Sequence, residues 1–287
     1  MKILKRLLFL FILFIIIGEI ALRFYGFCNA PLYYSSKEYE YLTFPKQEGT
    51  RFGNRYYFNA FSQRSQEPSK KKKRILGLGD SVLNGGIPTD QDSLATTILS
   101  KATNYQFLNV SAGSWGPDNL AAYLKRYGTF NAEKMVLVCS SHDSYDNMDF
   151  MPVVGNHPSY PHKQYFLAWI ELIDRYLWPR IFGESNQGND IIKNGIEFNI
   201  GFDSLLKIAN KDSIDFILYL HPEQSEISAK KYTEQGDEII EWAKKNQVTL
   251  IKGLDLGFVL SDYRDNIHLN EAGQRKLAQV LKIGLKL

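Results

Sequence analysis

The side chain best placed for chemistry in this sequence is a serine at the end of a short apolar run. The run at 75–78 leads into Gly79-Asp80-Ser81, and Gly85 and a second glycine follow within a few residues. An apolar run closed by glycines predicts a buried β-strand and the turn that ends it. In an open α/β sheet, ligands bind at the carboxyl ends of the strands. A serine there could use its hydroxyl as a nucleophile in acyl transfer.

The same glycines would also suit a phosphate-binding loop, so their spacing has to decide between the two interpretations. Gly77-x-Gly79 begins like the G-x-G-x-x-G dinucleotide motif, but Val82 stands where the third glycine belongs. The G-K-[ST] ending of a nucleotide-binding P-loop is absent as well. The sequence therefore favours a serine nucleophile, provided that the chain supplies a base.

A candidate base lies near the C-terminus. A serine hydroxyl needs a base within hydrogen-bond reach, and the base needs an orienting group. Among the five histidines, His268 follows Asp265 in an Asp-x-x-His sequence, just before a predicted helix that Asn270 could cap. In such a loop Asp265 could fix the tautomer of the imidazole. Taken alone, the same spacing also fits a simple helix-capping loop.

The G-D-S sequence that ends in Ser81 and the D-x-x-H sequence that ends in His268 together resemble the SGNH/GDSL hydrolase superfamily. The resemblance covers residues 74–287. It implies that Ser81 is the nucleophile, that His268 is its base and that Asp265 orients the base. It also implies an oxyanion hole with a backbone N–H after the second strand and a side chain after the third.

The two middle motifs depart from the family's pattern. In NVSAGSWGPDN, at 109–119, Ser114 stands where the oxyanion glycine is usual, with Gly113 beside it. Because a backbone N–H does the work, a serine need not abolish the hole. In the SSHD sequence after the third strand, His142 occupies the asparagine position, and an imidazole can also donate. We expect Ser81, Ser114, Gly113 and His142 to form the hole; a site that binds without hydrolysing is the alternative.

Further side chains are expected to contact substrate at the same edge of the sheet. They are Asp80, Trp115, Asp118, Asp143 and His221. For Asp143 the commoner use is to brace its loop, and for His221, which ends the fourth strand, a structural role is favoured over substrate contact. The aromatic residues that could stack on a sugar are Trp115, Tyr145, Tyr160 and Trp169, although single aromatic side chains more often belong to a core.

The elements that must position these residues follow from apolar periodicity. Strands are expected at Ile75–Leu78, Phe107–Val110, Met135–Cys139, Phe216–Leu220 and Thr249–Lys252. Helices are expected at Ser93–Ala102, Asn119–Tyr127, Phe166–Trp178, Lys230–Asn246 and Glu271–Leu285. Strands that alternate with helices predict a three-layer α/β/α, flavodoxin-like sandwich around a parallel, about five-stranded sheet.

Two segments lie outside this alternation. The connection between the third and fourth strands carries an insertion at about 149–200, and insertions of this length are usually functional or act as a lid. Its apolar helix would place Trp169, Ile173 and Tyr176 on one face. Residues 24–73 are rich in Tyr and Phe and predict loops and two or three short strands that pack on the edge of the domain.

The N-terminus predicts a membrane anchor. Three basic residues at 1–6 precede an apolar run, and the span 7–23 is slightly short of the roughly 20 residues that a bilayer needs. Flanking Lys and Arg side chains can make up the length by snorkelling. The positive charges place residues 1–6 in the cytoplasm and the rest of the chain outside. Since no clear cleavage site follows, we expect a signal anchor rather than a cleaved signal peptide or a buried helix.

Composition narrows the choice of partners. A net charge of +3 over 287 residues gives no argument for nucleic acid, and the basic run at 70–74 reads as a solvated approach to a strand, with anionic lipid or acidic polysaccharide as the alternative contact. Cys28 and Cys139 are not expected to pair. No cofactor or metal is expected, because two prolines interrupt the spacing of His157 and His162 and no acidic pair lies near them.

Together these features predict a membrane-anchored serine esterase or O-acyltransferase with its catalytic domain on the extracytoplasmic side. Its substrate would be ester groups, O-acetyl groups above all, of a cell-surface or exported polysaccharide, and polysaccharide-export proteins would be its partners. The alternatives are a lipid or thioester esterase, and a catalytically impaired glycan-binding or assembly subunit of a polysaccharide export system.

Overall fold

The five predicted strands form one parallel sheet. In the computed structural model, which describes residues 2–182, 191, 193 and 195–287, the strands lie in the order β6-β5-β7-β8-β9. Their bounds are β5 Lys73–Gly79, β6 Tyr105–Ser111, β7 Lys134–Ser140, β8 Asp215–His221 and β9 Thr249–Lys252. This strand order is that of flavodoxin-like doubly wound folds. The predicted fold class is therefore confirmed.

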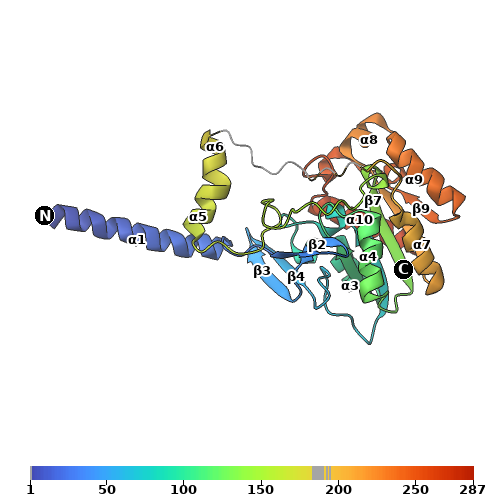
Figure 1. Ribbon diagram of the computed structural model, residues 1–287, viewed down its shortest axis with the longest axis horizontal. Helices are drawn as coiled ribbons and strands as arrows, with labels where there is room; N and C mark the ends of the chain where they lie inside the picture. The colour runs from blue at the N-terminus through green and yellow to red at the C-terminus, as the bar shows by residue number, and fades with distance from the viewer. Residues whose placement is uncertain (1, 183–190, 192, 194) are drawn as a thin grey trace.

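Helices cover both faces of the sheet, because alternate side chains of a strand point to opposite sides. Leu76 and Leu78 of β5 pack toward α4, α7 and α9, whereas Ile75 packs toward α2, α3 and α10. The helices are α2 Ser81–Asn84, α3 Ala95–Ala102, α4 Pro117–Tyr127, α7 Gly201–Lys211, α8 Gln224–Ala229, α9 Glu234–Lys245 and α10 Glu271–Gly284, with short 3-10 turns at Gln91–Ser93, Ser141–Ser144, Gly253–Leu256 and Leu260–Asp262. Figure 1 shows the resulting layers.

Three helices were not predicted, the short α2 among them, and one starts later than expected. Helices α7 and α8 fall between the insertion and α9, on either side of the predicted strand that becomes β8. Lys230, expected to open a long helix, instead ends α8 in a left-handed conformation with a φ of 56°. Helix α9 begins at Glu234, because the side chain of Thr233 accepts a hydrogen bond from the backbone N–H of Gly236.

The segment before the sheet folds into two β-hairpins. They consist of β1 Tyr33–Ser36 with β2 Glu40–Thr43, and β3 Gln47–Arg51 with β4 Asn54–Phe58. Four short strands thus occur where two or three were expected. Tyr39 and Tyr41 are buried and join the core on the α4 side of the sheet, so this segment completes the domain.

Helix α1 (Lys2–Tyr25) extends away from the rest of the molecule, as Figure 1 shows, and none of its residues is buried. Within the described part of the chain it is the one helix that is long and apolar enough to cross a membrane. A signal sequence would pass the same test.

The insertion contains one continuous helical segment, which we call the insertion helix. It is made of α5 (Ala168–Leu172), a π-helical stretch (Ile173–Leu177) and α6 (Trp178–Phe182). Trp169, Ile173 and Tyr176 were expected on one face of this helix, and the three differ in what they contact. Trp169 packs against α1, Tyr176 packs against Phe27 and Phe52, and Ile173 is 47% exposed. The π-helical stretch changes the rotation per residue, so a 3.6-residue period fails across it.

Candidate active site

Ser81 stands at the carboxyl end of β5, as expected, and is the first residue of α2. Asp80 caps this short helix, with Oδ1 accepting a hydrogen bond from the N–H of Val82 at 2.8 Å. A side chain at Gly79 would lie 2.9 Å from the carbonyl oxygen of Val138 and from Cβ of Leu83, so only glycine fits before the turn. The sharp turn leaves the hydroxyl of Ser81 partly accessible.

His268 and Asp265 lie against this serine. Nε2 of His268 is 2.8 Å from Oγ of Ser81, and Nδ1 is 2.9 Å from both carboxylate oxygens of Asp265. Asp265 also accepts from the backbone N–H of His268 at 2.7 Å. Partial burial opposes ionisation of Asp265, but the hydrogen bonds from His268 outweigh it and hold the pKa of this carboxyl well below its usual range. With Nδ1–H directed to the carboxylate, Nε2 is left to accept the serine proton.

His221 supports the loop that carries His268. Its ring is fully buried, and Nε2 lies 2.9 Å from the carbonyl oxygen of Ile267. Burial lowers the pKa of His221 to about 4, so the ring is neutral and donates through Nε2–H. The structure therefore gives His221 the structural role and no surface for substrate.

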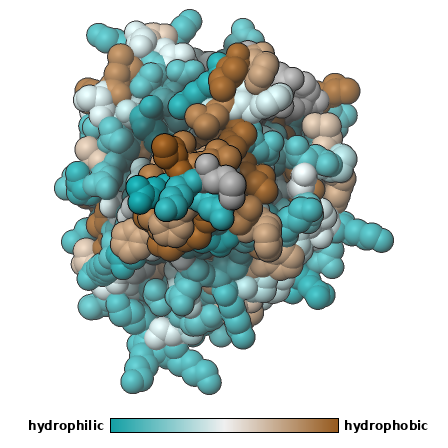
Figure 2. Space-filling view, turned by 90° about the vertical axis from the view of Figure 1, so that its left-hand side faces the viewer, coloured by the Kyte–Doolittle hydropathy of each residue, from teal (hydrophilic) through white to brown (hydrophobic). Residues whose placement is uncertain are grey.

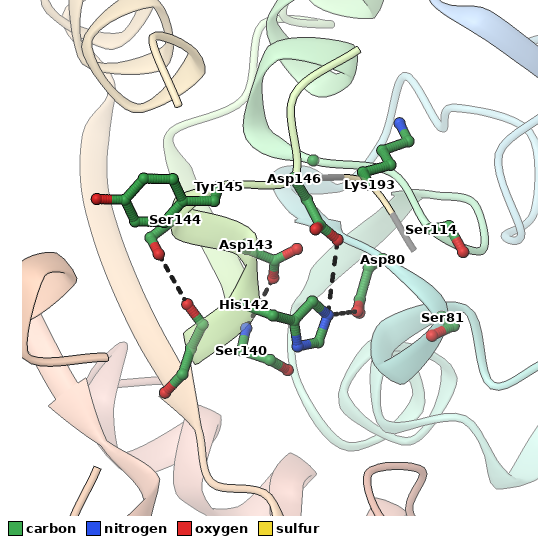
Figure 3. Close-up of polar contacts among 12 residues, drawn as sticks. Asp80, Ser81, Ser114, Ser140, His142, Asp143, Ser144, Tyr145, Asp146 and Lys193 are labelled. Carbon is green, nitrogen blue, oxygen red and sulfur yellow. Dashed lines mark hydrogen bonds and ion pairs between the residues drawn. The ribbon is translucent and has the colours of Figure 1, made fainter. Parts of the chain in front are cut away.

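The loop after β6 places Ser114 on the other side of the serine. Ser114 has a φ of 56°, in the left-handed region that glycine adopts without strain. The hydroxyl of Tyr41 donates to the carbonyl oxygen of Gly113 at 2.8 Å and holds the loop from the N-terminal segment. A side chain at Gly113 would meet the hydroxyl of Tyr160 at 2.7 Å. Figure 3 shows Ser81 and Ser114 on the same side of Asp80.

His142 is surrounded by carboxylates. Nδ1 lies 3.0 Å from Oε1 of Glu223, and Nε2 lies 3.8 Å from Asp146 and 3.9 Å from Asp80. Figure 3 shows the ring directed at these two aspartates. Burial opposes protonation, but the hydrogen bond to Glu223 and the charges of Asp143, Asp146 and Asp80 outweigh it and raise the pKa of His142 to about 10. The ring is therefore an imidazolium at neutral pH.

The carboxylates outnumber this single cation. Burial raises the pKa of Asp80 and of Asp143, and it raises that of Asp146 to about 6. The Nζ of Lys193 binds Glu40 at 2.5 Å and, in Figure 3, points away from the cluster, so Lys193 acts on the cluster through its charge, which opposes the rise in the pKa of Asp146. Protons shared within the cluster offset part of the excess negative charge.

The same residues are the ones that could hold a metal ion. One ligand atom from each of Asp80, His142 and Asp143 lies within 4.8 Å of the others. Asp143 uses Oδ2 to accept from the backbone N–H of Ser140 at 2.7 Å, and its buried Oδ1 has no hydrogen-bond partner. Imidazole and carboxylate donors suit several divalent cations. Bracing of the loop by Asp143 thus agrees with the sequence analysis, whereas a grouping of Asp143 and His142 with Asp80 that could hold a metal was not expected.

Other predicted substrate residues lie away from the serine or have structural partners. Trp115 is 1% exposed between Tyr39 and Tyr123, which leaves no ring face for a sugar. Asp118 accepts from the backbone of Met148 at 2.7 Å and from Asn199 at 3.1 Å, and so ties the two ends of the insertion to α4.

Among the predicted aromatic residues, only Tyr145 reaches the surface near the cluster. The hydroxyl of Tyr145 donates to Glu238. Tyr160 is buried beneath Gly113, beside Tyr41, and Trp169 lies on α1.

Sequence reasoning missed several residues that shape the site. Glu223 and Asp146 flank His142, and Arg64 holds the turn after Ser81 by donating to the carbonyl oxygens of Gly86 at 2.7 Å and Thr89 at 2.8 Å. A signal existed for Glu223, because it follows the carboxyl end of β8, where ligands gather in such folds. Arg64 lies far from any motif and gave no signal.

The fold and this site define a class: an α/β protein with a Ser-His-Asp arrangement at the carboxyl edge of its parallel sheet. No family model and no curated protein matches the chain. Among solved structures, it is similar to a lipolytic G-D-S-L family protein from Veillonella parvula (13% identity, 73% of this chain and 96% of that one, TM-score 0.40). It is also similar to an acetyl xylan esterase, AlAXEase (13%, 74% and 99%, TM-score 0.44), and to the esterase EstA from a Pseudoalteromonas species (14%, 75% and 97%, TM-score 0.42).

Proposed function

We propose that the protein is a serine esterase or O-acyltransferase of the SGNH/GDSL type. The observation that carries this proposal is the unbroken chain of contacts from Ser81 to His268 at 2.8 Å and from His268 to Asp265 at 2.9 Å. His268 would take the hydroxyl proton as Oγ attacks an ester carbonyl, and Asp265 would stabilise the imidazolium that forms. Water would then release the acyl group from Ser81, or a sugar hydroxyl would accept it.

The oxyanion would be held by the backbone N–H groups of Ser81 and Ser114, or of Gly113, with the side chain of His142. The high pKa of His142 supports this part of the proposal, because a permanent imidazolium is a strong donor to a developing negative charge.

We further propose that the substrate is an O-acetylated cell-surface or exported polysaccharide and that export proteins are partners. The support is the exposed apolar helix α1 behind a basic N-terminus, which would anchor the domain on the extracytoplasmic side through residues 7–23. An ester of a lipid or a thioester is the alternative substrate.

A second candidate function rests on the surroundings of His142. Both of its ring nitrogens face carboxylates, which compete with an oxyanion for its protons. In this reading the protein is a catalytically impaired subunit that binds glycan for an export machine.

Covalent labelling tests these functions. A fluorophosphonate should label the full chain in detergent, and Ser81→Ala and His268→Ala should lose the label while keeping the wild-type melting temperature. A folded wild-type protein that stays unlabelled would exclude both enzymatic functions and leave the binding subunit. Release of acetate from an acetylated glycan, measured with and without an acceptor glycan, then separates hydrolysis from transfer.

A further inference from the structure

We propose that the insertion helix, Ala168–Phe182, is a second membrane-contacting element that lies in the lipid–water interface beside α1. The inference rests on the proposed anchoring by α1. It assigns this helix of the insertion to the membrane, whereas length alone indicated a functional segment or a lid.

The first observation is a run of exposed apolar side chains along this helix. The exposed fractions are 47% for Ile170, 47% for Ile173, 39% for Leu177, 49% for Trp178, 71% for Ile181 and 57% for Phe182, and Phe166 just before the helix is 85% exposed. Single exposed apolar residues are ordinary, but a contiguous set marks an interaction surface. Figure 2 views the molecule from the side on which α1 projects and shows apolar side chains gathered around it.

The second observation is that the helix begins on α1 itself. Nε1 of Trp169 donates to the carbonyl oxygen of Ile15 at 2.9 Å, and its ring lies 5.7 Å from that of Phe14. The ring fits because α1 has Gly18 at this point, where a Cβ would lie only 2.1 Å away. Ile15 precedes Glu19, the charged residue that ends the apolar run of α1, by about 6 Å along the helix axis. Trp169 would therefore lie near this end of the run, where a bilayer crossed by the residues before Glu19 has its interface and where tryptophans are favoured.

The third observation is that the junction is fixed. Glu19 of α1 accepts from the backbone N–H groups of Ala168 at 2.9 Å and Trp169 at 3.2 Å, and so caps the insertion helix. The guanidinium of Arg51 binds Glu171 at 2.5 Å, and both side chains are at most 3% exposed. The insertion helix is thus held in one direction relative to α1.

That direction suits an interfacial helix. In Figure 1 the insertion helix crosses the direction of α1 steeply, so that it would run along a membrane that α1 crosses. Its 15 residues span about 22 Å, too short to cross a bilayer. Arg175 turns to the protein and donates to the carbonyl oxygen of Pro158 at 2.7 Å, while Asp174 and Arg180 are exposed. Charged groups among apolar ones fit the interface and not the hydrocarbon core.

Quenching by spin-labelled lipids in nanodiscs tests this proposal on the full chain. In a Cys28→Ser background, where Cys139 is buried, single cysteines replace Ile181, Ile12 of α1 or the exposed Lys207 of α7, and each carries the dye NBD. We expect a phosphatidylcholine with a nitroxide near its headgroup to reduce the emission at 181 at least twofold and to leave that at 207 unchanged.

The three positions separate the two proposals. Quenching at 12 without quenching at 181 would overturn the interfacial helix and keep the anchor. No quenching at 12 by a phosphatidylcholine with its nitroxide along the acyl chain would overturn the anchor and the inference that rests on it. Equal quenching at 181 and 207 would also overturn the inference, since it would reflect general nearness to lipid and not contact by this helix.

Discussion

Two histidines face the candidate site, and the difference between them lies in what each ring nitrogen meets. His268 has one carboxylate on Nδ1 and a hydroxyl on Nε2. His142 has a carboxylate on Nδ1 and two more within 4 Å of Nε2. The first arrangement leaves a nitrogen that can accept a proton, and the second keeps the ring charged. A histidine side chain can therefore act as a base or stay a fixed cation, depending on whether its Nε2 faces a hydroxyl or carboxylates.

The largest effect should come from the serine itself. Ser81→Ala removes the nucleophile and should lower kcat for hydrolysis of p-nitrophenyl acetate by about 10⁶-fold, as removal of a triad nucleophile does elsewhere. The melting temperature is the control for folding. Retention of more than a hundredth of the activity would show that the ester is cleaved at another site.

Next in size is the acid that orients His268. Asp265→Asn should lower kcat by about 10⁴-fold, because the imidazole loses its tautomer and its counter-charge. Glu223→Gln is the matched control, since it changes the acid on Nδ1 of His142 in the same way. We expect kcat of the control variant to fall far less than that of Asp265→Asn. Equal reductions in kcat would contradict the difference in role between the two histidines.

Replacement of His142 tests whether its side chain stabilises the oxyanion. His142→Ala should cost about 10²–10³-fold in kcat, and His142→Asn should recover most of it by restoring a neutral donor. Because the pKa of His142 is raised to about 10, wild-type activity that depends on its charge should fall as the pH rises through 10. The activity of the His142→Asn variant should not fall as the pH rises through 10. An asparagine variant much faster than the wild type would instead show that the histidine impairs the hole.

A smaller effect is expected on stability. Burial raises the pKa of Asp146 to about 6, so between about pH 4 and 6 the folded state binds more protons than the unfolded state. The free energy of unfolding therefore falls as the pH rises through this range. Asp146→Asn should remove this pH dependence and stabilise the protein at pH 8 by about 3 kcal/mol, with little change at pH 4. Urea denaturation at both pH values measures this, and a less stable variant at pH 8 would contradict it.

The smallest effect is expected from chelation. EDTA should leave esterase activity unchanged, because the proposed chemistry uses protons and no ion. Loss of activity on chelation, with recovery on addition of one divalent cation, would show that Asp80, His142 and Asp143 hold that ion. The variant Asp143→Asn should then need more of the cation.

The parts of the site that sequence predicted are those built from local signals. Ser81 was found because an apolar strand, two glycines and a turn are contiguous in the chain, and His268 because Asp265 lies three residues away. The five strands followed from their apolar runs in the same way. These features can be recognised without knowing which strands are neighbours in the sheet.

The parts that sequence did not predict depend on distant segments. Glu223 reaches His142 only because β7 and β8 pair side by side, which places residues 81 positions apart in contact. Whether His142 serves as a donor depends on this distant carboxylate and also on Asp146, which lies only four residues along the chain but belongs to no motif that the sequence analysis used. The same holds for Tyr41, which supports Gly113 from a hairpin whose register only the fold defines.

The position of Arg64 has a consequence for how the catalytic unit is delimited. Its side chain, which is buried, donates to carbonyl oxygens in the turn that follows Ser81, although the residue precedes the sheet in sequence. A protein trimmed to begin at residue 74, where the strand alternation starts, would leave these carbonyl groups without donors and a cavity the size of an arginine against this turn. The turn that holds Ser81 is therefore built from both sides of that sequence boundary, and the segment after the hairpins supplies the side chain that fixes it.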